Sequence, residues 1–230
     1  MKFRHVMLMT FVDGNAAANA SDFTIDNVAW GGTLNGTNPN VSVQTDPAYA
    51  GSGSGWIVVA DSIAYAEPGN YSISVSIHDS VGNYLTSTNT QFNVTDAPLS
   101  DSTPTMTISS TEGVANSNFV VMKFSDANPV APALDFSITG VSWGGTLLGS
   151  APVLTVVRDP SYLGTGSGWE VVADSVTYAE PGSYNVSLTV NDTDGSRVTT
   201  SNISFGITDA ALTDATPVQS LNAVAGLVSN

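Results

Sequence analysis

The amino-acid sequence predicts an all-β protein built from two tandem β-sandwich domains. Three observations carry this prediction: a long internal repeat, strands of alternating polarity, and regularly spaced turns. Features of the chain recur 113 positions later, so that Trp30 recurs as Trp143 and Trp56 as Trp169. A repeat of this length indicates a duplicated domain. No segment shows the 3.6-residue periodicity of an amphipathic helix.

The clearest repeated motif is a Glu-Pro-Gly turn followed by a strand. It runs from Tyr65 to Asp79 in the first copy and from Tyr178 to Asp192 in the second. Apolar and small polar residues alternate along both strands. This period of two indicates strands with one buried face and one solvated face.

Each copy is expected to contain the same strands in the same order. In the first copy they cover residues 6–11, 23–30, 41–43, 57–60 and 71–77, with a last strand that ends at residue 94. In the second copy they cover residues 119–124, 136–143, 153–157, 170–173 and 184–190, with a last strand that ends at residue 207. Short strands with regular turns favour β-sandwiches. The apolar start of the chain aligns with residues 119–124, so it is interpreted as a core strand rather than a signal peptide.

Several motifs carry a family resemblance. They are the segments Phe-Ser-Asp-Ala-Asn-Pro at 124–129, Tyr-Ala-Glu-Pro-Gly-Ser-Tyr at 178–184, Asn-Asp-Thr-Asp-Gly at 191–195 and Thr-Asp-Ala-Ala-Leu at 208–212. Together they resemble the PKD-like, immunoglobulin-like repeats of large prokaryotic cell-surface proteins. The resemblance implies immunoglobulin-like sandwiches outside the cell. Such repeats often carry Asp-Trp-Gly-Asp-Gly, whereas this chain has Trp30-Gly-Gly and Trp143-Gly-Gly, without those acidic residues.

The frame of the repeat divides the chain into three parts. Residues 1–100 form a sandwich that lacks its first strand, because the strand expected at 105–109 has no counterpart ahead of Met1. Residues 101–217 form a complete sandwich. Residues 218–230 align with residues 105–117. They are therefore expected to form the first strand of a further sandwich, whose other strands are not part of this sequence.

A missing strand at one end and a spare strand at the other predict head-to-tail assembly. An open sheet edge accepts a foreign strand, and a contact of this kind propagates into a filament. The residues expected at this polymer interface are Val218, Leu221, Val224, Leu227 and Val228 of the donor strand, with Lys2, Arg4, Val6 and Leu8 of the acceptor. The carboxylate of the donor is expected near Lys2 and Arg4. The hypothesis fails if residues 218–230 hang free in solvent or fold back onto their own chain.

Two other functions stay open at this point. The chain can be a two-repeat segment of a giant cell-surface adhesin or stalk, in which the repeats are joined covalently. It can also be a glycan-binding surface module, in which Tyr49 and Trp56 stack on sugars, although packing of these rings in the core or an interface is the favoured interpretation. No asymmetric group of polar residues survives the repeat comparison, so we expect no enzymatic activity.

The composition restricts the partners. The formal net charge is −15, with five Lys and Arg residues in 230. This charge repels nucleic acids and anionic membranes, and no apolar stretch is long enough to cross a bilayer. The chain has no Cys, so disulfides do not stabilise it. We expect an extracellular protein on the cell surface, whose partners are copies of itself and, in the alternative, surface glycans.

Most Asp residues recur in register in the two copies, which is typical of side chains that cap turns. Calcium binding is the alternative, because oxygen ligands on loops suit this ion. The calcium candidates are Asp96, Asp101, Asp209 and Asp214 at the joints, with Asp13 and Asp126 in nearby loops. No other cofactor is expected.

Overall fold

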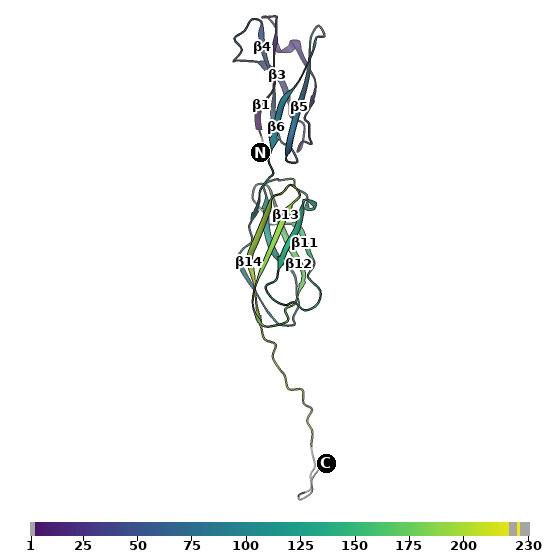
Figure 1. The fold of residues 1–230 in the computed structure, drawn as a ribbon, viewed down its shortest axis with the longest axis vertical. Helices are drawn as coiled ribbons and strands as arrows, with labels where there is room; N and C mark the ends of the chain where they lie inside the picture. The colour runs from purple at the N-terminus through teal and green to yellow at the C-terminus, as the bar shows by residue number, and fades with distance from the viewer. Residues whose placement is uncertain (1–2, 221–224, 226–230) are drawn as a thin grey trace.

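The computed structural model describes residues 3–220 and residue 225. Two β-sandwiches follow one another along the long axis of the molecule, and an extended tail leaves the second one (Figure 1). Lys2 and four of the predicted donor residues, Leu221, Val224, Leu227 and Val228, lie outside the described part of the chain.

The first sandwich contains six strands in two three-stranded sheets. The strands are β1 (Phe3–Asp13), β2 (Phe23–Ala29), β3 (Val41–Thr45), β4 (Ser54–Ile63), β5 (Gly69–Asp79) and β6 (Tyr84–Val94). One sheet has the order β1-β4-β3 and the other β2-β5-β6. All strand pairs in these sheets are antiparallel.

The second sandwich contains eight strands in two four-stranded sheets. The strands are β7 (Leu99–Asp101), β8 (Met106–Thr111), β9 (Asn116–Asp126), β10 (Phe136–Ser142), β11 (Leu154–Arg158), β12 (Ser167–Val176), β13 (Gly182–Asp192) and β14 (Arg197–Thr208). Their orders are β11-β12-β9-β7 and β10-β13-β14-β8. The helices described are two single 3-10 turns, Ala20–Asp22 and Ala133–Asp135. The all-β prediction is therefore confirmed.

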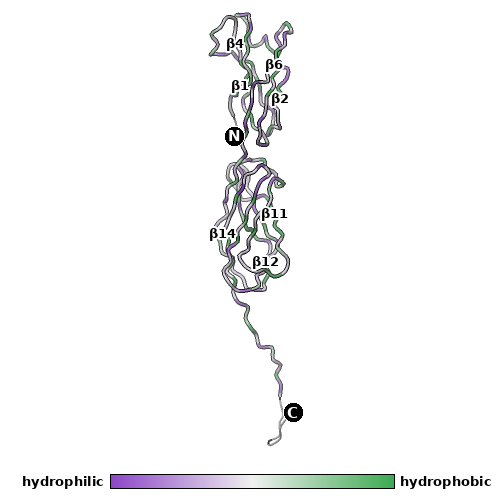
Figure 2. The backbone as a smooth tube through the Cα atoms, in the orientation of Figure 1, coloured by the Kyte–Doolittle hydropathy of each residue, from purple (hydrophilic) through white to green (hydrophobic). Residues whose placement is uncertain are grey.

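The core of each sandwich lies between its two sheets. In β13, Val186, Leu188 and Val190 are at most 1% exposed, and the residues between them are half-buried. This is the alternation that the sequence predicts for a strand with one face inward. Figure 2 shows apolar residues along the strands of both sandwiches. Burial of each Val or Leu side chain contributes about 1.5–3 kcal/mol to folding.

The Glu-Pro-Gly turn is held by a pair of stacked tyrosines in each sandwich. The rings of Tyr178 and Tyr184 are 4.5 Å apart and inclined by 3°, and the Tyr178 hydroxyl donates to the Trp143 carbonyl at 2.7 Å. Tyr65 and Tyr71 repeat the stack at 4.1 Å. The repeated motif therefore anchors β5 and β13 in the same way.

The boundary between the sandwiches lies earlier than the sequence division at residues 100 and 101. Leu99 begins β7, pairs with Asp126 of β9 and is 8% exposed in the core of the second sandwich. Leu99 and Ser100 thus belong to the second sandwich. Repeat alignment alone missed this strand, because three residues are too few to show a periodic pattern.

Candidate functional site

The two sandwiches differ most at the edge of one sheet. In the second sandwich, β8 lies parallel to the edge of β14, from Met106 opposite Ile203 to Thr111 opposite Thr208. In the first sandwich, β6 occupies the position of β14, and within residues 3–220 no strand pairs with that edge. An unpaired strand edge presents backbone donors and acceptors that another strand can satisfy.

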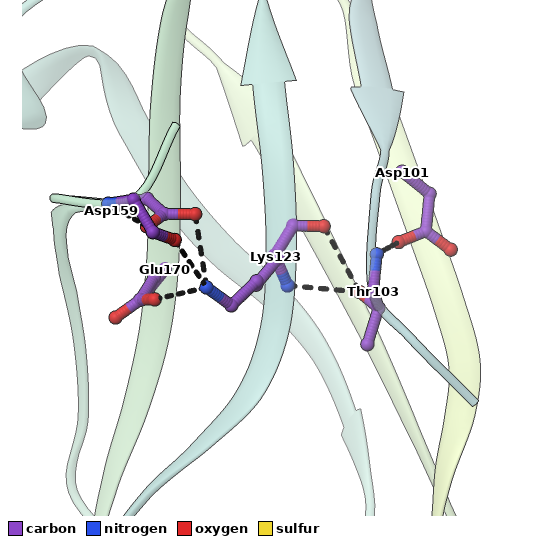
Figure 3. A network of polar contacts seen from close by, with 6 residues as sticks. Asp101, Thr103, Lys123, Asp159 and Glu170 are labelled. Carbon is purple, nitrogen blue, oxygen red and sulfur yellow. Dashed lines mark hydrogen bonds and ion pairs between the residues drawn. The ribbon is translucent and has the colours of Figure 1, made fainter. Parts of the chain in front are cut away.

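The other sheet of the second sandwich also has an extra strand. Thr103 follows β7 and docks on β9: its hydroxyl donates to the Lys123 carbonyl at 3.0 Å and accepts the Lys123 N–H at 2.9 Å. The Thr103 N–H in turn donates to Asp101 Oδ1 at 2.9 Å (Figure 3). In the first sandwich Thr10 stands at the position of Lys123, and β1 is the edge strand of its sheet.

Residues near these two edges are less buried in the first sandwich than in the second. Leu85 is 46% exposed, whereas its counterpart Val198 is 9% exposed. Three further half-buried residues of the first sandwich have buried counterparts, namely Tyr65 against Tyr178, Phe92 against Phe205 and Val94 against Ile207. Strands β7 and β8 therefore complete the core of the second sandwich, and the first sandwich is left partly open.

The tail after β14 repeats the sequence that precedes β9. Leu212 matches Leu99 and is fully exposed, as is Val218. Asp214 Oδ1 accepts the Thr216 N–H at 2.8 Å, which is the turn that Asp101 and Thr103 make. The described part of the tail, residues 209–220, is exposed to solvent. An exposed tail is the outcome that counts against strand donation, so the single chain does not bear out the assembly hypothesis. Support for assembly therefore comes from the open edges of the first sandwich.

The predicted acceptor residues have different surroundings. Leu8 is 1% exposed, because it already packs in the core of its own sandwich. This corrects the prediction that Leu8 contacts a partner. Val6 is half-buried against the same core, and Arg4 pairs with Ser62 through its backbone.

A second candidate site is an acidic hollow of about 350 Å³ at the joint between the sandwiches. Its carboxylates come from Glu67, Asp96, Asp126, Asp135, Asp192 and Asp194. Only Asp96 and Asp126 belong to the predicted calcium set. The other four were missed, because their loops are far apart in the sequence and meet only at the joint.

Burial and mutual repulsion change the acidity of these groups. Asp126 is 4% exposed, and burial raises the pKa of its carboxyl to about 6. The negative charges of Asp192 and Asp96 raise this pKa further, while the N–H of Asn128 opposes the rise. Burial, with neighbouring carboxylates, also raises the pKa of Asp96 and of Glu67. Ionisation of these groups therefore lowers the stability of the folded joint.

The predicted calcium ligands do not form one site. Asp13 ends the eleven-residue strand β1, about 33 Å from the end near the joint at a rise of about 3.3 Å per residue. Asp101 bonds with Thr103 and with the amide of Asn202, while Asp209 and Asp214 lie in the exposed tail. Among the described residues no group of three or more acidic or His side chains is arranged to hold a metal ion. We therefore do not propose a calcium site.

The rings considered for glycan stacking are only partly available. Trp56 is 2% exposed and donates its ring N–H to Ser54 Oγ at 2.9 Å, so it belongs to the core. Tyr49 is half-buried, and its hydroxyl donates to the Ser52 carbonyl at 2.6 Å. Trp169 repeats the burial of Trp56 at 1% exposed. Core packing, the favoured interpretation, is thus correct for both tryptophans.

Comparison with known proteins leaves the family open. No family model and no curated protein matches the sequence. Among solved structures, the fibronectin(III)-like modules of Clostridium thermocellum CbhA have 14% identity over 86% of this chain and 100% of theirs, with a TM-score of 0.24. The extracellular domain of protocadherin GammaB4 has 15% identity over 84% of this chain and 33% of that chain, with a TM-score of 0.28.

An endo-fucoidan hydrolase from glycoside hydrolase family 107 has 16% identity over 81% of this chain, with a TM-score of 0.30. This chain spans about a quarter of the length of that hydrolase and a third of that of the protocadherin. Similarities this low carry no argument about function, and the PKD-like family is not confirmed. In the described part of the chain, no helix has the length and apolar character needed to cross a bilayer.

Proposed function

We propose that this chain is a structural subunit of an extracellular filament, which assembles head-to-tail by strand donation. The segment from Val218 onward of one copy adds to the open edge of β6 in the next copy. One observation carries the proposal: β14 has a parallel partner in β8, β6 has none in the described residues, and the sequence that matches β8 lies in the tail. The role is structural, and the proposal includes no catalytic step.

The repeat defines the register of the donated strand. Met106 lies opposite Ile203 and Thr107 opposite Ser204, so Gln219 is placed opposite Thr90 and Ser220 opposite Gln91. The hydroxyls of Thr107 and Ser204 are 2.9 Å apart. Ser220 and Gln91 are also polar and can form a bond across the same face.

The contact is heterologous, since the tail of one copy meets the first sandwich of another. Such a contact leaves one open edge and one free tail on every growing assembly, so it propagates as a filament. The driving force is burial of partly exposed core residues such as Leu85 and Val94, together with pairing of the backbone of β6.

The test is to purify the 230-residue chain and examine it by electron microscopy and analytical ultracentrifugation. We expect filaments that denaturing electrophoresis resolves into a single band near 23.7 kDa. Removal of residues 218–230 should leave soluble monomers with a less stable first sandwich. Filaments of normal length from the truncated chain would refute strand donation.

A peptide with the sequence of residues 209–230 provides the matched control. Added to the truncated chain, it should bind with one-to-one stoichiometry and protect the amides of β6 from hydrogen exchange. A peptide of the same composition in scrambled order should not. If the protein is isolated from its source as a much larger covalent band, the partner is a neighbouring repeat of one long chain, and assembly from separate copies is excluded.

A further inference from the structure

The tail contains segments that match both β7 and β8 of the second sandwich. Only the segment that matches β8 takes part in the proposed donation to β6. We propose that residues 212–214 of the same tail form a second donated strand, which pairs antiparallel with β1 of the next copy. This inference rests on the proposed function and extends it to the other sheet. Each tail would then hold both sheets of the acceptor.

The second sandwich contains the template for this contact. Leu99 pairs with Asp126, Ser100 with Ser125 and Asp101 with Phe124. The equivalent pairs between two copies are Leu212 with Asp13, Thr213 with Val12 and Asp214 with Phe11. Every residue in these three pairs lies in the described part of the chain.

The residues of the template contact are buried, whereas the equivalent residues of the tail and of β1 are more exposed. Leu99 is 8% exposed, whereas Leu212 is fully exposed. On the acceptor side, Asp126 is 4% exposed, whereas Asp13 is half-buried. Docking of the second strand would cover Leu212 and Asp13 together, as β7 covers the end of β9.

The donor segment already has the local shape of its template. The Thr216 N–H donates to Asp214 Oδ1 at 2.8 Å, and the Thr103 N–H donates to Asp101 Oδ1 at 2.9 Å. A segment that is preorganised in its bound conformation loses less entropy when it docks. In the template, Thr103 then bonds to both backbone groups of Lys123, a position that Thr10 occupies in the acceptor.

The acceptor also has the counterpart of the side chain that forms hydrogen bonds with this turn. The amide of Asn202 donates to Asp101 Oδ2 at 3.3 Å and to the Thr103 carbonyl at 2.9 Å. Its counterpart is Asn89, whose backbone N–H bonds to Ser87 Oγ as that of Asn202 bonds to Thr200 Oγ1.

Because the residue type and the local bond are kept, the amide of Asn89 is placed to donate to Asp214 and to the carbonyl of Thr216. The joint between subunits would therefore be a copy of the joint within the chain, and sandwiches would follow one another at equal spacing along the filament.

Disulfide trapping tests both donated strands, since the chain has no native Cys. Val12→Cys chains mixed with Thr213→Cys chains should give, on mild oxidation, a disulfide-linked dimer of twice the 23.7 kDa chain mass. Gln91→Cys chains mixed with Ser220→Cys chains test the β6 contact in the same way. Each single variant oxidised alone measures background dimer. Paired strand residues lie within the range of Cα distances that disulfides need.

Two double variants within the second sandwich calibrate the method. Ser100→Cys with Ser125→Cys, and Thr107→Cys with Ser204→Cys, reproduce the two contacts inside one chain and should give an intramolecular disulfide. Asn89→Ala should lower the yield of the Val12–Thr213 dimer several-fold and leave the Gln91–Ser220 dimer nearly unchanged.

The outcomes separate the two proposals. Trapping at both pairs supports the double donation. Trapping at Gln91 and Ser220 without trapping at Val12 and Thr213 overturns the second strand and leaves the filament proposal standing. Absence of both dimers, with the two calibrating disulfides formed, overturns strand donation altogether.

Discussion

The two sandwiches share their repeat, their turn motif and six equivalent strands, yet their edges differ. In the second sandwich, β7 and β8 cover one edge of each sheet. The same residues that they cover, such as Phe205 at 0% exposed, are half-buried in the first sandwich as Phe92. The six repeated strands are therefore not a complete folding unit. A complete sandwich also needs the two strands that come directly before them in the sequence, as β7 and β8 come before β9.

The largest expected effect comes from completing the first sandwich within its own chain. Residues 209–226 placed directly before Met1 continue the repeat without a gap. We expect the Tm of the first sandwich to rise by about 15 °C or more. Burial of Leu212 and Leu221, whose counterparts Leu99 and Ile108 pack in the second core, contributes up to about 1.5–3 kcal/mol each, and 1 kcal/mol shifts the Tm of such a domain by about 4–8 °C. The change is measured by calorimetry of a chain that carries this addition and lacks residues 218–230, compared with the chain that only lacks residues 218–230.

The matched control carries the same addition with Leu212→Asp and Leu221→Asp. It should leave the Tm of the first sandwich close to that of the truncated chain. An equal rise with both additions would mean that the added length stabilises the sandwich by some other route than strand docking.

The next effect concerns the acidic joint. The pKa of Asp126 is about 6 in the folded protein against an ordinary value of 3.8, so the folded state binds this proton more tightly than the unfolded state. Lowering the pH from about 7.5 to about 5 should therefore stabilise the second sandwich, by about 1.4 kcal/mol. Asp126→Asn should raise stability at pH 7.5 and flatten the dependence, as measured by urea unfolding. A stability that falls over this pH range would contradict the assignment.

A comparison within the two cores distinguishes two equivalent phenylalanines. Phe205→Ala should cost about 3–5 kcal/mol, because its ring is fully buried. Phe92→Ala should cost about 2 kcal/mol less in the truncated monomer, since that ring is half-buried. Residues 209–226 placed before Met1 should remove most of the difference. Equal costs in the truncated monomer would show that the first sandwich is already closed.

The smallest effect comes from an ion-pair network that only the second sandwich has. The Lys123 ammonium lies 2.6 Å from Glu170 Oε1 and 3.0 Å from Asp159 Oδ2 (Figure 3). The first sandwich has Thr10, Ile57 and Asp46 at these positions. Because the Lys123 side chain is 26% exposed, we expect Lys123→Met to cost less than about 1 kcal/mol. Urea unfolding at low and high salt checks the value, and a loss above about 2 kcal/mol would show that the network is structural.

Much of the fold could be predicted because its pattern is local. Alternating polarity identified the strands, the Glu-Pro-Gly motif identified the turn before β5 and β13, and the repeat showed which strands are equivalent. The position of residues 218–230 in the repeat frame also came from the sequence, and with it the hypothesis of donation. These inferences need only neighbouring residues or a comparison of the chain with itself.

Tertiary structure decided what depends on packing between distant segments. It buried Leu8 in the first core, where the sequence predicted an interface. It also placed Trp56 in that core, which agrees with the favoured interpretation of this ring and excludes it from sugar stacking. It brought Glu67 and Asp194 to one joint although 127 positions separate them in the sequence. It also revealed β7, whose three residues are recognisable only by their pairing with β9. The physical reason is that a strand's own residues encode its two faces, whereas its neighbours are chosen by pairing and burial across the whole sandwich.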